Sequence, residues 1–376
     1  MIENEGRSEL RAELAKCFIN KANALSELRL FKDGLDLYDK AIDVYEKLIE
    51  KEGRGEIKAD LAMAYVLKGG SLLSLEETEE ALKFYEKGIM IYEDSIENEG
   101  RRDLRAQLAS SMLDMGITFE SKENYEKAIE LFDRSIDIFK ELIEKEGRRD
   151  LLDNLANIYW HKGKALGTIR RFDEAIELIN NSTRLYEELI NIEGRRDLQG
   201  ELARSYALKG ILLRLREDFE SAIESFDRAV EIFQKTEGVD SYLSELVSIY
   251  IEKALTLAYS NNLDGAITCL DYGSKVLRDI ETKEDIRIQT AEISIMKGFI
   301  FEGMGRVDAA LEAIDYGMKK YQELILENEY ELVADDIEEV YEECRKWMEY
   351  IGNANKCSHS DKTIREFIER LKKGRV

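Results

Sequence analysis

The sequence predicts an all-α solenoid, a fold in which helical hairpins stack one upon the next. A fixed repeat is the first reason: the triplet Glu-Gly-Arg recurs at intervals of 47 residues, and such a period is typical of stacked repeat proteins. The second is that proline, which breaks helix interiors, is absent from all 376 residues. The third is a 44% hydrophobic composition, which suffices for a core. The triplets contain Gly6, Gly53, Gly100, Gly147 and Gly194.

An apolar stripe marks the first helix of each unit. In the fourth unit Leu151, Leu155, Tyr159, Gly163 and Leu166 follow one another in steps of four and three. This spacing places side chains on one face of a helix. The same steps recur in the other units, so each stripe predicts a helix of about 20 residues with one buried face.

A second helix is predicted after a short turn. In the fifth unit Ala222 and Ile223 precede Phe226 and Ala229. Large and small residues alternate along this face, which lets two helices approach closely. The repeated glycine then fits the end of the second helix, where a left-handed residue commonly closes the last turn.

Two shorter units follow the five long ones. The small residue of the first helix reappears at Ala254 and Gly298, each 44 residues after its predecessor. About seven hairpins are therefore predicted over residues 1–330. Residues 331–376 are predicted to form C-terminal capping helices, because the last repeat of a solenoid needs its apolar face covered. A docking segment for another protein is the alternative for the final helix, which contains Ile364 and Leu371.

This pattern of large, small and aromatic residues resembles the tetratricopeptide repeat (TPR) family. The fifth unit matches it best, with Tyr206, Gly210, Phe219, Ala222, Phe226 and Ala229. The usual unit has about 34 residues, so this chain resembles a long-helix variant with a 47-residue unit, such as those of kinesin light chains. The resemblance implies a right-handed superhelix of TPR-like hairpins with a concave face lined by first helices. It also implies binding of a peptide or helix of a partner protein.

Charge and cysteine usage narrow the class of partner. A net charge of −24 disfavours nucleic acid and anionic membranes, which both attract basic proteins. No run of 18 apolar residues predicts a membrane span. The four cysteines, Cys17, Cys269, Cys344 and Cys357, form no Cys-x-x-Cys pair, which favours a reducing cytoplasm. Cys17 and Cys269 are predicted to be small buried residues, because both stand at apolar helix positions.

No catalytic constellation is present in the sequence. The two histidines, His161 and His359, offer few candidates for a general base. There is neither a phosphate-binding glycine loop nor a Gly-x-Ser-x-Gly motif. We therefore expect a non-enzymatic protein without a cofactor or a metal site.

The resemblance also indicates which residues line the concave face. These are Ile19, Asn23, Met63, Val66, Leu113, Ile117, Asn157, Trp160, His161, Lys164, Arg204 and Ile211. Most are apolar, which predicts an apolar ligand such as an amphipathic helix. The alternative is that the longer helices bury this stripe against the next unit. Trp160 is a candidate hot spot, since tryptophan is enriched at the centres of interfaces; the alternative is a tryptophan packed between units.

Paired arginines also recur with the repeat, at residues 101–102, 148–149 and 195–196. A basic ridge along one edge is suited to an acidic partner. The alternative is that these arginines pair with nearby glutamates such as Glu93 and Glu141, which would add little stability.

Three functions are compatible with these features. The first is a scaffold that binds a partner's peptide or helix, and the second is the regulatory arm of a larger effector, for example a caspase-like protease. The third is a structural solenoid that associates with itself. Residues 1–6 reproduce the close of a second helix, as in residues 96–100. We therefore expect a segment of a longer protein, or self-association through an uncapped N-terminal end.

Overall fold

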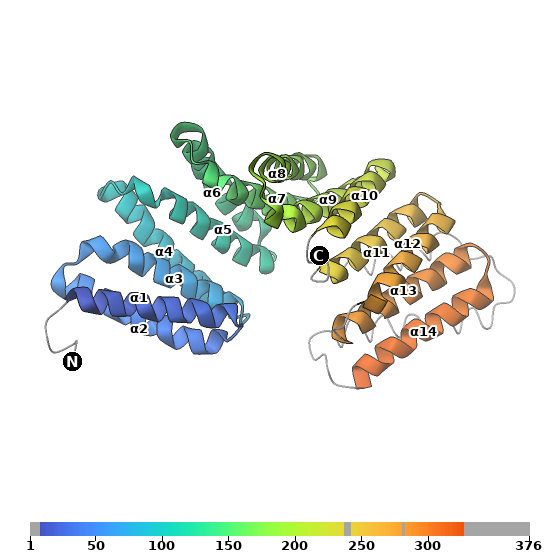
Figure 1. Cartoon of the computed structure of the whole chain (residues 1–376), viewed down its shortest axis with the longest axis horizontal. Coiled ribbons are helices and arrows are strands. Elements are labelled where there is room, and N and C mark those ends of the chain that lie inside the picture. The colour runs from blue at the N-terminus through green and yellow to red at the C-terminus, as the bar shows by residue number, and fades with distance from the viewer. Residues whose placement is uncertain (1–7, 237–241, 280–282, 327–376) are drawn as a thin grey trace. The chain divides into compact units, whose positions relative to one another are not determined.

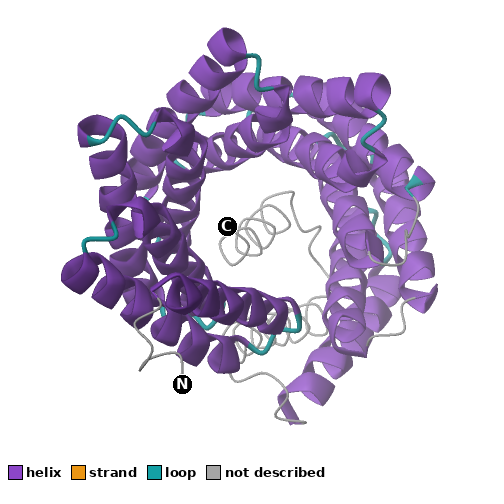
Figure 2. Cartoon of the chain, turned by 60° about the vertical axis from the view of Figure 1, so that its left-hand side comes forward, coloured by secondary structure: helices purple, strands orange, loops and turns teal. Residues whose placement is uncertain are grey.

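The chain is built from antiparallel helical pairs that follow one another in sequence (Figure 1). A computed structural model describes residues 8–236, 242–279 and 283–326, and these contain 14 α-helices. Short loops join the helices, and no strand occurs in the described ranges (Figure 2). The all-α prediction and the hairpin order are thus confirmed. The predicted capping helices at 331–376 lie outside the described residues.

The chain divides into two compact units, residues 1–185 and 186–376. In the first unit each first helix packs on its own second helix, and α3, α5 and α7 also pack on the second helix of the preceding hairpin. The first helices α1, α3, α5 and α7 also touch in succession. The helices are α1 Ser8–Glu27, α2 Phe31–Glu52, α3 Lys58–Leu73, α4 Thr78–Asn98, α5 Arg105–Ser121, α6 Tyr125–Glu146, α7 Leu152–Thr168 and α8 Phe172–Glu193, which runs across the boundary.

The second unit repeats the same order of contacts. Its helices are α9 Gln199–Leu215, α10 Phe219–Lys235, α11 Leu243–Tyr259, α12 Leu263–Val276, α13 Lys283–Gly303 and α14 Val307–Leu326. The second helices α10 and α12 have 17 and 14 residues, whereas α2 and α6 have 22. Each interval of 44 residues therefore contains a second helix that is shorter than α2 and α6.

The repeated glycine closes the second helices in a left-handed conformation. Gly147 has φ 69°; its N–H donates to the Ile143 carbonyl, and the next N–H, of Arg148, donates to the Leu142 carbonyl at the end of α6. Glycine adopts this conformation without the steric cost that a Cβ imposes. The following Arg148 donates to the Asp150 carboxylate at 2.7 Å, and Arg149–Leu151 form a 3₁₀ turn, η4, that leads into α7. This local chemistry explains why the triplet recurs as a unit.

The turn inside each hairpin also needs a left-handed residue, which the sequence does not signal. A positive φ occurs at Arg29, Glu76, Glu123, Arg170, Glu217, Asn261 and Gly305. These positions are spaced by 47 and then 44 residues, in step with the repeat. Only the last is glycine, so six side chains adopt a conformation that costs roughly 1–2 kcal/mol for residues other than glycine. Packing of the two helices must outweigh that cost.

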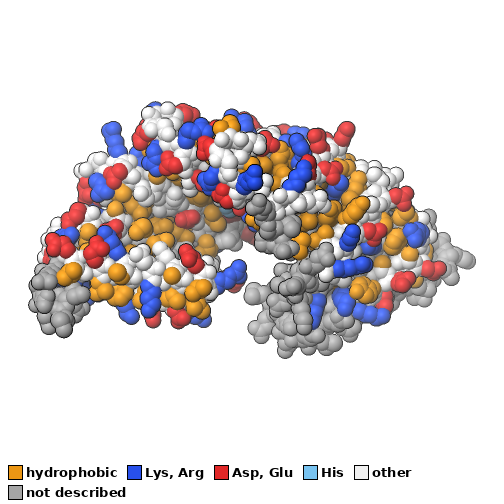
Figure 3. Space-filling view, in the orientation of Figure 1, with side chains coloured by type: hydrophobic (Ala, Val, Ile, Leu, Met, Phe, Trp, Pro, Cys, Tyr) orange, Lys and Arg blue, Asp and Glu red, His pale blue; other side chains and the backbone are white. Residues whose placement is uncertain are grey.

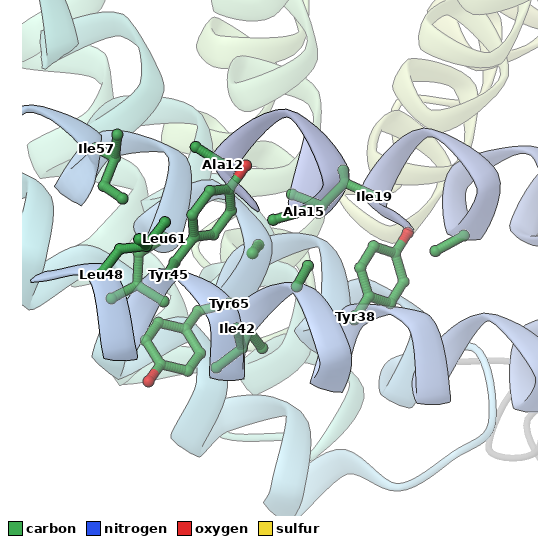
Figure 4. Close-up of a cluster of buried hydrophobic side chains, with 13 residues drawn as sticks. Ala12, Ala15, Ile19, Tyr38, Ile42, Tyr45, Leu48, Ile57, Leu61 and Tyr65 are labelled. Atoms are coloured by element: carbon green, nitrogen blue, oxygen red, sulfur yellow. The ribbon is translucent and has the colours of Figure 1, made fainter. Parts of the chain in front are cut away.

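Each hairpin core interlocks a large side chain with a small one. A Cβ added at Gly116 of α5 would lie only 2.5 Å from Cε1 of Phe132 in α6, so the ring packs directly on the helix backbone. The first core is continuous across a hairpin boundary: Tyr45 and Leu48 of α2 pack with Leu61 and Tyr65 of α3 (Figure 4). Neighbouring hairpins therefore share one hydrophobic core.

Buried lysines tie successive hairpins together. Lys68 of α3 binds Asp39 of the preceding α2 at 2.5 Å, and only 11% of the lysine side chain is exposed. The same contact joins Lys162 to Asp133, Lys253 to Asp227 and Lys297 to Asp271. The aspartates are mostly exposed, which limits the stability that each pair contributes. The ladder nevertheless marks the register of α3, α7, α11 and α13, each on the second helix before it.

Candidate protein-binding surface

The first-helix face of the N-terminal unit is partly occupied by the core itself. Ile19 and Leu113 are only 2% and 7% exposed. Val66 packs on α4, since a Cβ at Gly88 would lie 2.7 Å from its Cγ2 atom. Ile19 and Leu113 therefore leave almost no surface for a partner, whereas Val66 is half-buried. For Ile19 and Leu113 the structure matches the alternative expectation that the long helices bury the stripe.

Other predicted residues of this unit remain accessible. Met63 is 39% exposed, Lys164 is exposed, and Ile117, Trp160 and His161 are half-buried. In the space-filling view, hydrophobic side chains form a band over the N-terminal unit with charged side chains on either side (Figure 3). An apolar surface with a polar rim is typical of protein interfaces.

Asn23 and Asn157, also predicted on this face, have different surroundings. Asn23 accepts a hydrogen bond of 2.6 Å from the Tyr38 hydroxyl inside the first hairpin. The side-chain oxygen of Asn157 is buried and has no hydrogen-bond partner in the described part of the chain. The Asn23 side chain therefore stabilises the first hairpin, whereas the Asn157 side-chain oxygen has no hydrogen-bond donor among the described residues.

A charged cluster links α5 to α7. Glu120, only 8% exposed, lies 3.1 Å from His161 Nδ1 and 2.8 Å from Lys164 Nζ. The Lys164 ammonium also lies 5.8 Å from the centre of the Trp160 ring, within reach of a cation–π contact. Trp160 and His161 meet edge to face with centroids 4.9 Å apart. The cluster thus holds the tryptophan, the histidine and the lysine together.

Glu120 was not predicted from the sequence, although its position in the repeat relative to His161 could have indicated the contact. Burial opposes ionisation of its carboxyl, but hydrogen bonds from His161 and Lys164 outweigh burial and lower its pKa. Its contribution to stability is therefore present at neutral pH and lost as the pH falls through the folded-state pKa. Glu120 precedes His161 by 41 residues, so it falls one hairpin earlier and one and a half turns further along the first helix.

Asp114 on the same helix is a charge at a buried position. Burial raises the pKa of its carboxyl to about 7, because the apolar surroundings disfavour the charged form. The unfolded carboxyl titrates near pH 3.9. The folded form is therefore stabilised by protonation of Asp114, and this stabilisation is lost as the pH rises through about 7.

Replacing Asp114 with asparagine is expected to remove this pH dependence. At pH 8 the Asp114→Asn protein should unfold at a higher urea concentration than the wild type, since it has no buried charge. At pH 5 the difference should shrink or reverse. Urea titrations at the two pH values measure it, and an identical difference at both would show that Asp114 ionises normally.

The C-terminal unit has a comparable pair at the same register. Arg214 of α9 is 4% exposed, and its Nη2 donates to Glu252 Oε2 of α11 at 2.8 Å. Neither residue was predicted. The predicted Arg204 binds Glu201 and Glu245 and lies over the Tyr242 ring, while Ile211 is half-buried. The Arg204 side chain is therefore bound by residues of the C-terminal unit itself.

The first arginine of each pair binds an aspartate nearby in the sequence rather than one of the expected glutamates. Arg101, Arg148 and Arg195 bind the aspartates two residues further on. Glu93 binds Arg134, and Glu141 binds Arg105 and Lys145. Arg101 and Arg148 therefore bind the aspartate of the next 3₁₀ turn instead of Glu93 or Glu141. The second arginines, Arg102, Arg149 and Arg196, are exposed.

The cysteine predictions were right for one residue and wrong for the other. Cys269 is buried, and burial raises the pKa of its thiol. Cys17 is exposed on α1, although its equivalents in later first helices are buried. Cys344 and Cys357 lie outside the described residues.

Two further features of the described ranges bear on function. No group of three or more histidine, cysteine, aspartate or glutamate side chains there is arranged to hold a metal ion. No helix there has both the length and the apolar character needed to cross a membrane.

Comparisons with known proteins agree with this architecture. The tetratricopeptide repeat family model matches residues 62–95 and 203–236. The search of curated proteins returned no significant match. Among solved structures, the apo form of RapI has a TM-score of 0.56 at 13% identity, covering 82% of this chain and 98% of that chain.

Two other solved structures have the same fold. BtubC from P. vanneervenii has a TM-score of 0.53 at 14% identity, covering 66% of this chain and 91% of that chain. A tetratricopeptide repeat protein from Parabacteroides merdae has a TM-score of 0.50 at 12% identity, covering 90% and 99%. Residues 62–95 and 203–236 thus match the tetratricopeptide repeat model, and the helical pairs have the same all-α fold as these solved structures.

Proposed function

We propose that this chain is a non-enzymatic scaffold that binds a peptide or an amphipathic helix of a partner protein. Tetratricopeptide repeat proteins are typically protein-binding scaffolds, and the long helices suggest a 47-residue variant of that repeat. The proposed surface comprises Met63, Ile117, Trp160, His161 and Lys164, from α3, α5 and α7. Ile19 and Leu113 are left out because they are buried in the core, and Val66 because its side chain packs on Gly88 of α4.

The observation that carries the proposal is the cluster around Glu120. Glu120 neutralises Lys164 and fixes His161, so an apolar partner meets Trp160 beside a charge that is already paired. Met63 adds a flexible apolar side chain that adapts to different ligands. Residues from three successive first helices are suited to apolar anchors repeated along a partner helix.

The proposal is tested with peptides selected against the full chain from a random display library. Trp160→Ala is expected to weaken the selected peptide about 30-fold, the effect of losing a hot spot worth about 2 kcal/mol. Lys164→Ala should weaken it less. Binding is measured by fluorescence anisotropy, with circular dichroism to confirm that each variant is folded.

Lys145→Ala is the matched control, since it removes the same charge from the exposed surface of the second helix α6. It should leave affinity unchanged. If both lysine variants behave alike and folded Trp160→Ala binds as the wild type does, the proposed surface is wrong. The regulatory-arm interpretation stays a prediction, since no feature of the described residues favours it over a free scaffold.

A further inference from the structure

The first helix α1 exposes positions that every later first helix of the N-terminal unit buries. Leu10 is 40% exposed, whereas its equivalents Ile57 and Leu104 are each 5% exposed. Cys17 is exposed, whereas its equivalents Ala64 and Ile158 are fully buried. Leu14 and Phe18 are likewise only half-buried. We call the face formed by Leu10, Leu14, Cys17, Phe18 and Lys21 the α1 strip.

In the later hairpins this face is covered by the second helix of the preceding hairpin. Ile57, Leu61, Ala64 and Tyr65 of α3 form one buried cluster with Ile42, Tyr45 and Leu48 of α2 (Figure 4). Within the described chain, no helix occupies the corresponding place on α1. The α1 strip therefore continues an interface that the protein forms repeatedly with itself.

Charge points to the same occupant. Lys21 holds the position that Lys68 and Lys162 hold in later first helices, where each binds an aspartate of the preceding second helix. Lys21 is exposed, and the described residues supply it with no carboxylate. The α1 strip thus combines an apolar surface with one cation whose register relative to a covering helix is given by the later hairpins.

Two of the covering helices, α2 and α6, share a motif that defines what would fit. Asp39, Ile42, Tyr45 and Leu48 in α2 correspond to Asp133, Ile136, Phe139 and Leu142 in α6. In both helices the aspartate binds the lysine, and the three apolar residues that follow at intervals of three are buried.

We propose that the α1 strip docks an amphipathic helix of a partner polypeptide that carries Asp-x-x-Ile-x-x-(Tyr/Phe)-x-x-Leu. The aspartate binds Lys21, and the aliphatic and aromatic residues cover Leu14, Cys17 and Phe18. Leu10 packs near the C-terminal end of the docked helix, as Ile57 does beside Leu48. This surface is separate from the one that contains Trp160 and Lys164.

The test uses a synthetic peptide of residues 125–148, which contains the α6 motif, and the full chain. Binding is followed by calorimetry and by the rate at which Cys17 is alkylated, read by mass spectrometry of its tryptic peptide. The expected result is saturable binding that slows alkylation of Cys17 at least tenfold. Cys269, which is buried with or without the peptide, is the internal control.

Charge reversal makes the test specific. Lys21→Glu should weaken the peptide about threefold, within the range of exposed ion pairs, and a peptide with Asp133→Lys should restore its binding. A peptide with Glu126→Lys carries the same change about 10 Å away along the helix and should not restore it. Leu10→Asp, at a position that is 40% exposed, should weaken binding about tenfold, with circular dichroism to confirm that the variant is folded.

Three results would overturn the proposal. The first is absence of binding with Cys17 alkylated at an unchanged rate. The second is binding that Trp160→Ala and Lys164→Ala abolish while the α1 variants do not, which would place the peptide on the other surface. The third is protection of Cys17 that rises with protein concentration without peptide, which would make a second copy the occupant. Failure here leaves the Trp160 surface untouched, because each test has its own variants.

Discussion

Replacing Phe132 with alanine is expected to lower the free energy of unfolding of the N-terminal unit by about 3–5 kcal/mol, the usual cost of removing a buried phenylalanine. Phe132 is fully buried in α6 and packs on Gly116 of α5. Because Gly116 has no side chain that could move into the space, the cavity would remain open. The loss should therefore lie toward the upper end of the range.

Urea denaturation measures the total effect, and hydrogen exchange locates it. Units of a repeat array contact only their neighbours, so exchange should accelerate most in α5 and α6. Met90→Ala is the control, because Met90 is a large but exposed side chain on α4 and its loss should cost less than about 0.5 kcal/mol. Losses of similar size in the two variants would contradict the packing described here.

Replacing Glu252 with alanine is expected to destabilise the C-terminal unit by about 3–5 kcal/mol, because it leaves a buried charge without a counter-ion. Arg214 is almost fully buried. Its Nε and Nη1 atoms have no hydrogen-bond partner among the described residues. The counter-charge for the guanidinium among these residues is therefore the Glu252 carboxylate. An uncompensated guanidinium in this position must either remain desolvated or open the contact between α9 and α11.

The reciprocal change is expected to behave differently. Arg214→Met replaces the buried guanidinium with an apolar side chain of similar length, and Glu252 is left 18% exposed with a route to water. Such replacements of buried ionic groups are often neutral or stabilising. The double variant should therefore recover most of the stability lost in Glu252→Ala. If Arg214→Met and Glu252→Ala cost the same, the pair is not governed by burial of the arginine.

The elements that local chemistry controls could be predicted from the sequence. Gly147 closes α6 in a left-handed conformation, as the repeated glycine indicated. The stripe through Leu155 and Tyr159 is buried in α7, as its spacing predicted. These predictions succeeded because a helix end or an amphipathic face depends on residues within a few turns of one another.

The candidate site was predicted less well, because burial depends on neighbours that are distant in sequence. Ile19, Val66 and Leu113 share a helix face with Met63 and Ile117, yet Ile19 and Leu113 are buried in the core and Val66 packs on α4. Glu120 was missed because a lone acid on an amphipathic helix is usually solvated. Its importance becomes visible only when α5 and α7 are side by side.

The sequence by itself determined the repeat, the helical class, the hairpin order and the glycine that ends the second helices, since each follows from short-range periodicity and backbone sterics. The tertiary structure alone decided which apolar positions face a neighbour and which face solvent. Cys17 shows the reason: its sequence position is equivalent to that of Ala64, but Ala64 is covered by a preceding second helix and Cys17 is exposed. Burial depends on contact between helices, so equivalent positions of a repeat differ in exposure when one of them has no neighbouring helix.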